Sequence, residues 1–170
     1  MASHSVYLFR HVQTQQVLIS TRQVLKSQNL KQIDNTTRPV RLRKDLWRPM
    51  VAITGFHTPQ SAQAVTDALI QRSQTRQLDF KMAEDHKMRP KRLRVVDEKD
   101  LVEKSVLSLR EALEKVGSKY IKQDEKLLAL WEQPRFMELK GDGNQWPSFL
   151  EHGQLELKNN RFVKSEETNQ

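Results

Sequence analysis

The strongest structural constraint in this 170-residue chain is an apolar stripe in its third quarter. The members recur at steps of four and three, the spacing of one helix face: Val102, Val106, Leu109, Leu113 and Val116. The pattern predicts a helix over about 98–116, with Asp97 as its N-cap and Gly117 as the residue that ends it. A helix with one apolar face must cover another apolar layer, so the chain needs a sheet or further helices beneath it.

Two β-favouring runs near the N-terminus can supply that layer. They are Ser5 to Arg10 and Gln16 to Thr21, and the stretch between them, 11–15, has the length of a hairpin loop. Met50 to Ile53 is a third candidate strand, entered through a proline and left through a glycine. We expect the first two runs to pair antiparallel.

A second helix is predicted to begin at Thr58-Pro59. The threonine hydroxyl can cap free amides, and proline suits the first helical position. Ala62, Val65 and Leu69 form its apolar stripe. The predicted fold class is α+β: a small antiparallel β-sheet with helices packed on one side, basic loops and an extended C-terminal tail.

The remaining segments carry weaker signals. Residues 24–33 have loose helical spacing, and residues 123–131 predict a short helix that ends before a proline. Residues 72–96 are basic and hydrophilic and predict a long loop or a segment that only a partner orders. Residues 135–170 predict an extended tail with isolated aromatic anchors. We therefore expect one α+β domain over residues 1–134, followed by the tail over 135–170.

Several classes of protein are excluded by composition. The longest uninterrupted apolar run is five residues, far short of the roughly 20 that a membrane helix needs. The chain has no cysteine, so it has neither a disulfide framework nor a cysteine zinc site. It has no glycine-rich phosphate loop and no histidine pair at metal-binding spacing. We expect no catalytic residues, no metal and no cofactor, and hence a protein that is not an enzyme.

Charge is distributed unevenly along the chain. Residues 1–96 hold 17 Lys+Arg against 6 Asp+Glu, a net charge of +11, whereas residues 97–170 hold 12 against 15, a net charge of −3. A local basic surplus attracts polyanions and gains free energy by releasing their counterions. Nucleic acid is therefore the leading partner class and an acidic membrane surface the second, while a merely solvated basic face is the alternative to both.

The candidate nucleic-acid contacts are mostly arginines, whose planar forks pair with phosphate and stack on bases. They are Arg10, Arg38, Arg41, Arg43, Lys44, Arg48, Arg72, Arg76, Arg89, Lys91, Arg92 and Arg94. Tyr7 and Trp47 are candidate stacking surfaces, although aromatic residues on strands more often belong to the core.

Five sequence blocks resemble a known family in order and spacing. They are residues 6–10, 16–20, 42–50, 107–116 and 131–137, and the third reads Leu-Arg-Lys-Asp-Leu-Trp-Arg-Pro-Met. The family is the fungal one named for transcriptional regulation of mitochondrial recombination. The resemblance covers most of the chain outside the 72–96 loop and the last residues.

The resemblance implies a mitochondrial matrix protein of the large ribosomal subunit, in contact with mitochondrial rRNA and neighbouring ribosomal proteins. It also implies homologous DNA pairing and transcription control. The contact positions that it suggests are Tyr7, Phe9, Arg10, Arg43, Asp45, Trp47, Arg48, Trp131, Glu132 and Pro134. The first acidic residue is Asp34, a composition also found in transit peptides, but the strand pattern favours mature structure with an uncleaved or internal targeting role.

Three hypotheses follow. The first is a structural rRNA-binding component of the fungal mitochondrial large ribosomal subunit, which supports mitochondrial translation. The second is a mitochondrial DNA-binding factor that promotes homologous pairing, recombination and transcription regulation. The third is a generic membrane-surface or scaffold protein.

Overall fold

The computed structural model describes residues 4–33, 38–82, 88, 90, 92, 101–121, 126–140, 145–155, 157–158 and 161–162. Its strands are β1 (His4–His11), β2 (Val17–Ser20), β3 (Trp47–Phe56), β4 (Leu127–Trp131), β5 (Leu150–Gln154), β6 (Leu157–Lys158) and β7 (Arg161–Phe162). Its helices are α1 (Pro59–Met82), α4 (Val102–Tyr120), the short α5 (Pro134–Glu138) and the 3₁₀ turns η1 (Ser27–Gln32) and η2 (Lys44–Leu46).

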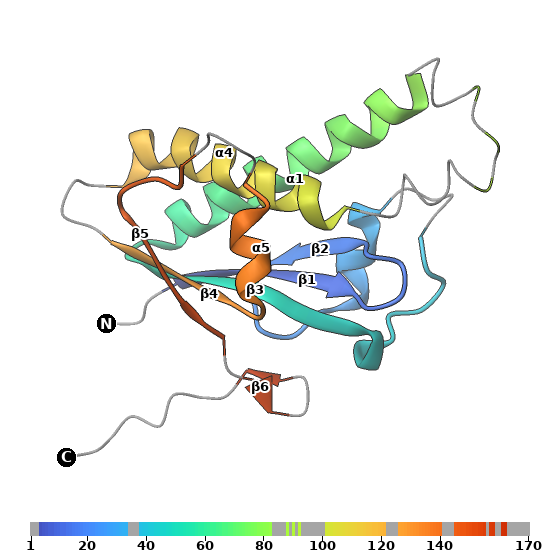
Figure 1. Cartoon of the computed structure of the whole chain (residues 1–170), viewed down its shortest axis with the longest axis horizontal. Coiled ribbons are helices and arrows are strands. Elements are labelled where there is room, and N and C mark those ends of the chain that lie inside the picture. The colour runs from blue at the N-terminus through green and yellow to red at the C-terminus, as the bar shows by residue number, and fades with distance from the viewer. Residues whose placement is uncertain are drawn as a thin grey trace.

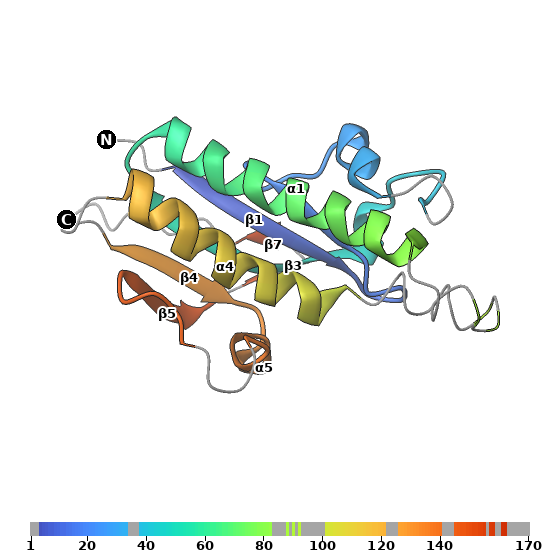
Figure 2. The same ribbon diagram turned by 90° about the horizontal axis from the view of Figure 1, so that it is seen from above.

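The main sheet has five strands in the order β2-β1-β3-β4-β5. All pairs are antiparallel except β4 with β5, which run parallel. Helices α1 and α4 lie side by side across one face of this sheet (Figures 1 and 2). The predicted α+β class, with helices on one side of a small and mostly antiparallel sheet, is therefore confirmed.

Alternation along β1 divides the core between the two faces of the sheet. Val6 and Leu8 point to the face covered by α1 and α4, while Tyr7 and Phe9 point to the opposite face. On that second face they meet Leu25, Leu30, Ile33 and Leu155 from η1, its flanks and the chain after β5. The sheet is thus buried on both faces near its β1 end.

The outer edge of β2 is covered by a side chain. The Gln32 amide at the end of η1 accepts a hydrogen bond from the Ile19 backbone N–H (2.9 Å) and donates one to the Ile19 carbonyl (2.7 Å). The predicted loose helix over 24–33 is therefore a 3₁₀ turn, and its role is to satisfy the backbone of an edge strand.

Helix α1 begins where the sequence predicts. The Thr58 hydroxyl accepts a hydrogen bond from the Ser61 backbone N–H at 3.3 Å, and Pro59 is the first helical residue. The helix continues to Met82, so the predicted loop over 72–96 is wrong for its first eleven residues. Arg72 and Arg76 are helical positions, and no proline or glycine interrupts the chain between them and the helix start.

Helix α4 buries the predicted stripe, but its ends differ from the prediction. It runs to Tyr120, so Gly117 lies inside the helix instead of ending it. A Cβ on Gly117 would lie 2.5 Å from Cζ of Phe149, which shows why this position lacks a side chain. The predicted N-cap, Asp97, lies outside the described residues.

The chain after α4 departs most from expectation. Residues 127–131 form strand β4, not the predicted helix, and pair with β3 through Val51 to Thr54. Part of the predicted tail forms α5 and β5, and β5 is a strand of the main sheet. The Leu150 N–H also donates to Pro147, and the Leu155 N–H to Trp131. An independent domain over residues 1–134 stays a prediction.

Candidate nucleic-acid interface

The segment 38–46, which leads into β3, presents exposed cations. Arg41, Arg43 and Lys44 are exposed, and Arg43 forms an ion pair with Asp45 at 3.0 Å. Both partners of that pair are more than 60% exposed, so water and salt screen it strongly. With three exposed cations and one exposed acid, this segment carries a net positive charge that attracts phosphate.

Arg38 holds this segment against η1. Its Nε donates to the Ile33 carbonyl at 2.9 Å, and its Nη2 donates to the Lys31 carbonyl at 3.3 Å. These bonds occupy one side of the guanidinium. Arg38 therefore positions the neighbouring cations as much as it contributes its own charge.

Arg10 and Arg48 occupy opposite positions on β1 and β3 and share one acid. The register pairs them directly, and Glu132, just after β4, accepts from Nη2 of Arg10 (2.7 Å) and from Nε of Arg48 (3.0 Å). The Arg10 and Glu132 side chains are 10% and 6% exposed, and the Arg10 guanidinium also lies 5.5 Å from the Phe136 ring centroid. This burial argues against a phosphate contact for Arg10. Arg48, at 39% exposure, retains an open side.

Tyr7 and Trp47 belong to the core on the sheet face opposite α1 and α4. They are 7% and 3% exposed, and Trp47 packs edge-on against His11 at 5.0 Å. A base needs an open ring face on which to stack, so their burial argues against the predicted stacking role.

The remaining predicted contacts divide between α1 and the chain that follows it. Arg72 and Arg76 lie on the side of α1 that faces α4, and Arg92 is exposed. Arg89, Lys91 and Arg94 lie outside the described residues.

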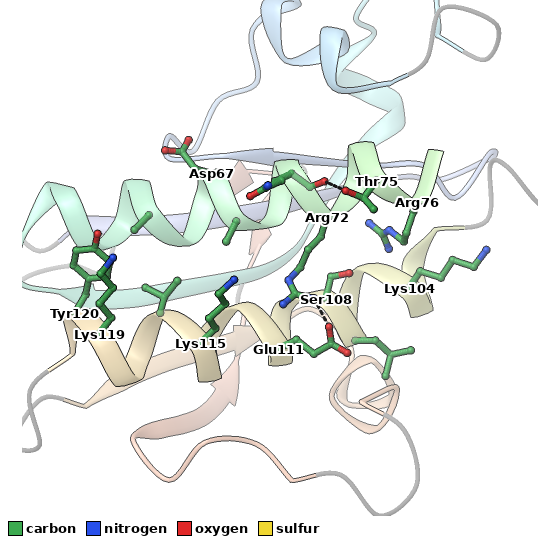
Figure 3. A pocket seen from close by; sticks show the side chains of 15 residues that line it. Asp67, Arg72, Thr75, Arg76, Lys104, Ser108, Glu111, Lys115, Lys119 and Tyr120 are labelled. Atoms are coloured by element: carbon green, nitrogen blue, oxygen red, sulfur yellow. Dashed lines mark hydrogen bonds and ion pairs between the residues drawn. The ribbon is translucent and has the colours of Figure 1, made fainter. Parts of the chain in front are cut away.

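A groove of about 680 Å³ runs between the outer sides of α1 and α4 (Figure 3). Small residues on α1, Ala64 and Ala68, contribute to its lining opposite the C-terminal half of α4. Its charged side chains comprise five cations and two acids, a net charge of +3: Arg72, Arg76, Lys104, Lys115 and Lys119, with Asp67 and Glu111.

Two neighbouring arginines in this groove differ in their pairing. Arg72 forms an ion pair with Glu111 of α4, whereas Arg76 lies between the helices. Nε and Nη1 of Arg76 are buried and have no hydrogen-bond partner among the described residues. Burial lowers the pKa of Arg76, Arg72 adds to this effect, and Glu111 opposes it.

Sequence reasoning singled out the arginines of this groove but not its lysines. Lys104, Lys115 and Lys119 are separated by eleven and four residues, a spacing that keeps them on one side of a helix. That pattern was readable on the polar side of α4. The part of α1 that lies opposite these lysines could not be predicted in the same way, because the hydrophilic sequence from residue 72 onward favours a loop.

The described part of the chain contains no group of three His, Cys, Asp or Glu side chains that could hold a metal ion. Its helices include none that is long and apolar enough to cross a membrane.

Comparison with known proteins adds evidence for the N-terminal half. Residues 3–83 match the family described as "Transcriptional regulation of mitochondrial recombination". The chain is also 42% identical over 57 residues to "Large ribosomal subunit protein mL67" of Schizosaccharomyces pombe, an alignment that covers 28% of this chain and 33% of that protein. The chain thus spans about a third of the length of this relative. The family resemblance visible in the sequence, to the family of transcriptional regulation of mitochondrial recombination, is therefore confirmed over residues 3–83.

Proposed function

We propose that this chain is a structural RNA-binding component of the mitochondrial large ribosomal subunit, located in the mitochondrial matrix. The observation that carries the proposal is its 42% identity with a protein named as a component of the large ribosomal subunit. In this role the chain contacts rRNA and neighbouring ribosomal proteins and catalyses no reaction.

The exposed cations of residues 38–46 support an electrostatic mechanism. Arg41, Arg43 and Lys44 project from a short segment that is tied to η1 through Arg38 and continues directly into β3. Such side chains neutralise phosphates and release counterions, while the rigid sheet fixes their orientation. Both effects bind and position RNA without any chemistry on it.

The first test is sedimentation of the tagged chain from a mitochondrial lysate, at a salt concentration that removes loosely bound factors. Comigration with the large subunit, lost after RNase treatment, is the expected result. Slow sedimentation with and without RNase would refute the ribosomal assignment.

A second test separates contact residues from net charge. Arg41→Gln, Arg43→Gln and Lys44→Gln are combined in one variant, and the matched control combines Arg22→Gln, Lys26→Gln and Lys126→Gln, which also alter exposed cations. With a single-stranded RNA, three lost contacts lower the slope of log K against log salt concentration by about 2. The same slope change in both variants would show that only overall charge matters.

A second candidate function is DNA pairing and control of mitochondrial recombination and transcription. It is favoured by the family description that matches residues 3–83. This function predicts that unlabelled single-stranded DNA competes better than rRNA fragments for the chain, and that the protein stays off the ribosomal gradient peak. Stronger competition by rRNA fragments would favour the ribosomal role.

A further inference from the structure

The groove between α1 and α4 has a linear arrangement of charge. From Lys104 to Lys119 the side of α4 that lines it spans fifteen residues, or roughly 22 Å at the helical rise. Arg72 and Arg76 face this row from α1. The cations therefore form a track between two helices, in contrast to the short surface segment at 38–46.

Among the described residues that line this track, five are cations and two are acids. Arg72 and Arg76 are one helical turn apart. Glu111 pairs with Arg72, and two nitrogen atoms of Arg76 are buried without a partner in the described chain. A buried donor that makes no hydrogen bond costs free energy. An anion placed in the groove would offset the repulsion between the Arg72 and Arg76 guanidinium groups, which both line it.

We propose that the groove between α1 and α4 binds the phosphodiester backbone of a single RNA strand. This inference rests on the proposed function and adds a second contact surface to it. The anion meets Arg76 in the groove, and Lys115 and Lys119 contact successive phosphates along α4.

An RNA backbone fits this groove better than a compact anion does. A single phosphate could satisfy Arg72 and Arg76, but it would leave the exposed Lys115 and Lys119 unused. The cations along the groove pair with phosphates, which are the same in every nucleotide. Recognition is therefore expected to be independent of base sequence.

The main experiment removes the two exposed lysines. Lys115→Gln with Lys119→Gln is compared with Arg22→Gln with Lys126→Gln, a control that loses the same charge outside the groove. Binding of a short fluorescein-labelled oligouridylate is measured by anisotropy across a salt series. The groove variant should lose about 1.4 from the salt slope, at 0.7 per contact, and the control much less. Equal slopes in the groove variant and the control would overturn the proposal.

A second variant tests Arg76 directly. Arg76→Met keeps a long side chain and removes the buried charge, so RNA affinity should fall while the thermal midpoint stays constant or rises. A purely structural arginine predicts the opposite, namely a lower midpoint with unchanged RNA affinity. That opposite result would also overturn the proposal.

These outcomes separate the groove from the proposed function. If the unaltered chain binds no RNA, the proposed function fails together with the groove. If the unaltered chain binds RNA, and only the variant with glutamine at positions 41, 43 and 44 weakens binding, the groove proposal is refuted and the proposed function stands. Displacement of the labelled oligouridylate at a lower concentration of negative charge by poly-glutamate than by unlabelled oligouridylate would make the groove a protein-binding surface and refute the RNA assignment.

Discussion

The shared carboxylate of Glu132 makes a strong prediction about stability. In the variant Glu132→Gln the side chain keeps its shape but loses its charge. Arg10 and Arg48 then face each other across β1 and β3 with no acid between them. Like charges at directly opposed strand positions destabilise a sheet. We therefore expect a substantial loss of stability.

The magnitude follows from the burial of the two ion pairs. Arg10 and Glu132 are almost fully buried, and removal of one partner from such a pair costs about 3–5 kcal/mol. The pair with Arg48 is partly solvated and adds less than about 1 kcal/mol. The glutamine oxygen can still accept one hydrogen bond, which restores about 1 kcal/mol. The expected loss is about 3 kcal/mol, a fall of roughly 6–12 °C in the melting temperature at this chain length.

Urea unfolding followed by circular dichroism measures this loss directly. Glu151→Gln is the matched control, because the Glu151 carboxylate pairs with Lys126 at an exposed position and its removal should cost less than about 1 kcal/mol. The double variant Arg10→Met with Glu132→Leu should be more stable than Glu132→Gln, since it leaves no unpaired buried charge. A loss below about 1 kcal/mol for Glu132→Gln, or a double variant less stable than the single one, would refute the reasoning.

Three further predictions concern the packing of helices and the sheet edge. Gly117→Ala should lower the free energy of unfolding by about 1–3 kcal/mol in urea titrations, because its methyl group collides with the Phe149 ring, and Phe149→Leu should relieve the loss. Thr58→Ala should cost about 1 kcal/mol by removing the cap of α1, whereas Thr58→Ser should cost little. Burial, assisted by Lys140, lowers the pKa of His152 below 6.5, and its Nδ1 accepts a hydrogen bond from Trp131. The unfolded chain therefore takes up the proton first, so stability should fall as the pH drops through 6.5, and His152→Gln should flatten this part of the thermal-midpoint profile.

Each of these predictions has a result that contradicts it. An unchanged loss for Gly117→Ala when Phe149 is leucine would show that the ring is not the obstacle. Equal stabilities for the alanine and serine variants of Thr58 would show that the hydroxyl does not stabilise the start of α1. A thermal midpoint that depends on pH in the same way with glutamine at position 152 would exclude His152 as the titrating group.

The sequence predicts those elements whose apolar residues have a clear spacing or whose first residues form a cap. The hairpin of β1 and β2, the start of α1 and the buried stripe of α4 all follow from spacing and capping within a few residues. The apolar stripe of α4 is informative because each of its residues is buried against the same sheet, which fixes the spacing between them.

The errors arise where tertiary structure overrides local preference. Strand β4 consists largely of leucine and alanine, which favour helices, and it is a strand because β3 and β5 bond to both of its edges. Strand β5 is mostly polar, with Leu150 buried, so it has no alternating signal of its own. Backbone pairing with β4 is what makes it a strand.

For the candidate sites, too, local sequence patterns do not predict which distant residues come together. Exposed cations on 38–46 could be predicted from composition, because short polar segments remain at the surface. Pairing of Glu132 with Arg10 and Arg48 joins residues 122 and 84 positions apart, and no local pattern carries that information. The groove likewise depends on two helices that are far apart in the sequence.

The bonds from Gln32 to Ile19 have a consequence for the order in which the chain folds. Strands β1 and β2 and the turn that covers their edge all lie within the first 33 residues. Their contacts are local in sequence, so they can form before α1 and α4 pack on the sheet. A hairpin whose outer edge is already bonded offers less backbone to a second nascent chain. The Gln32 side chain thus covers the outer edge of β2 independently of the helices that cover a face of the sheet.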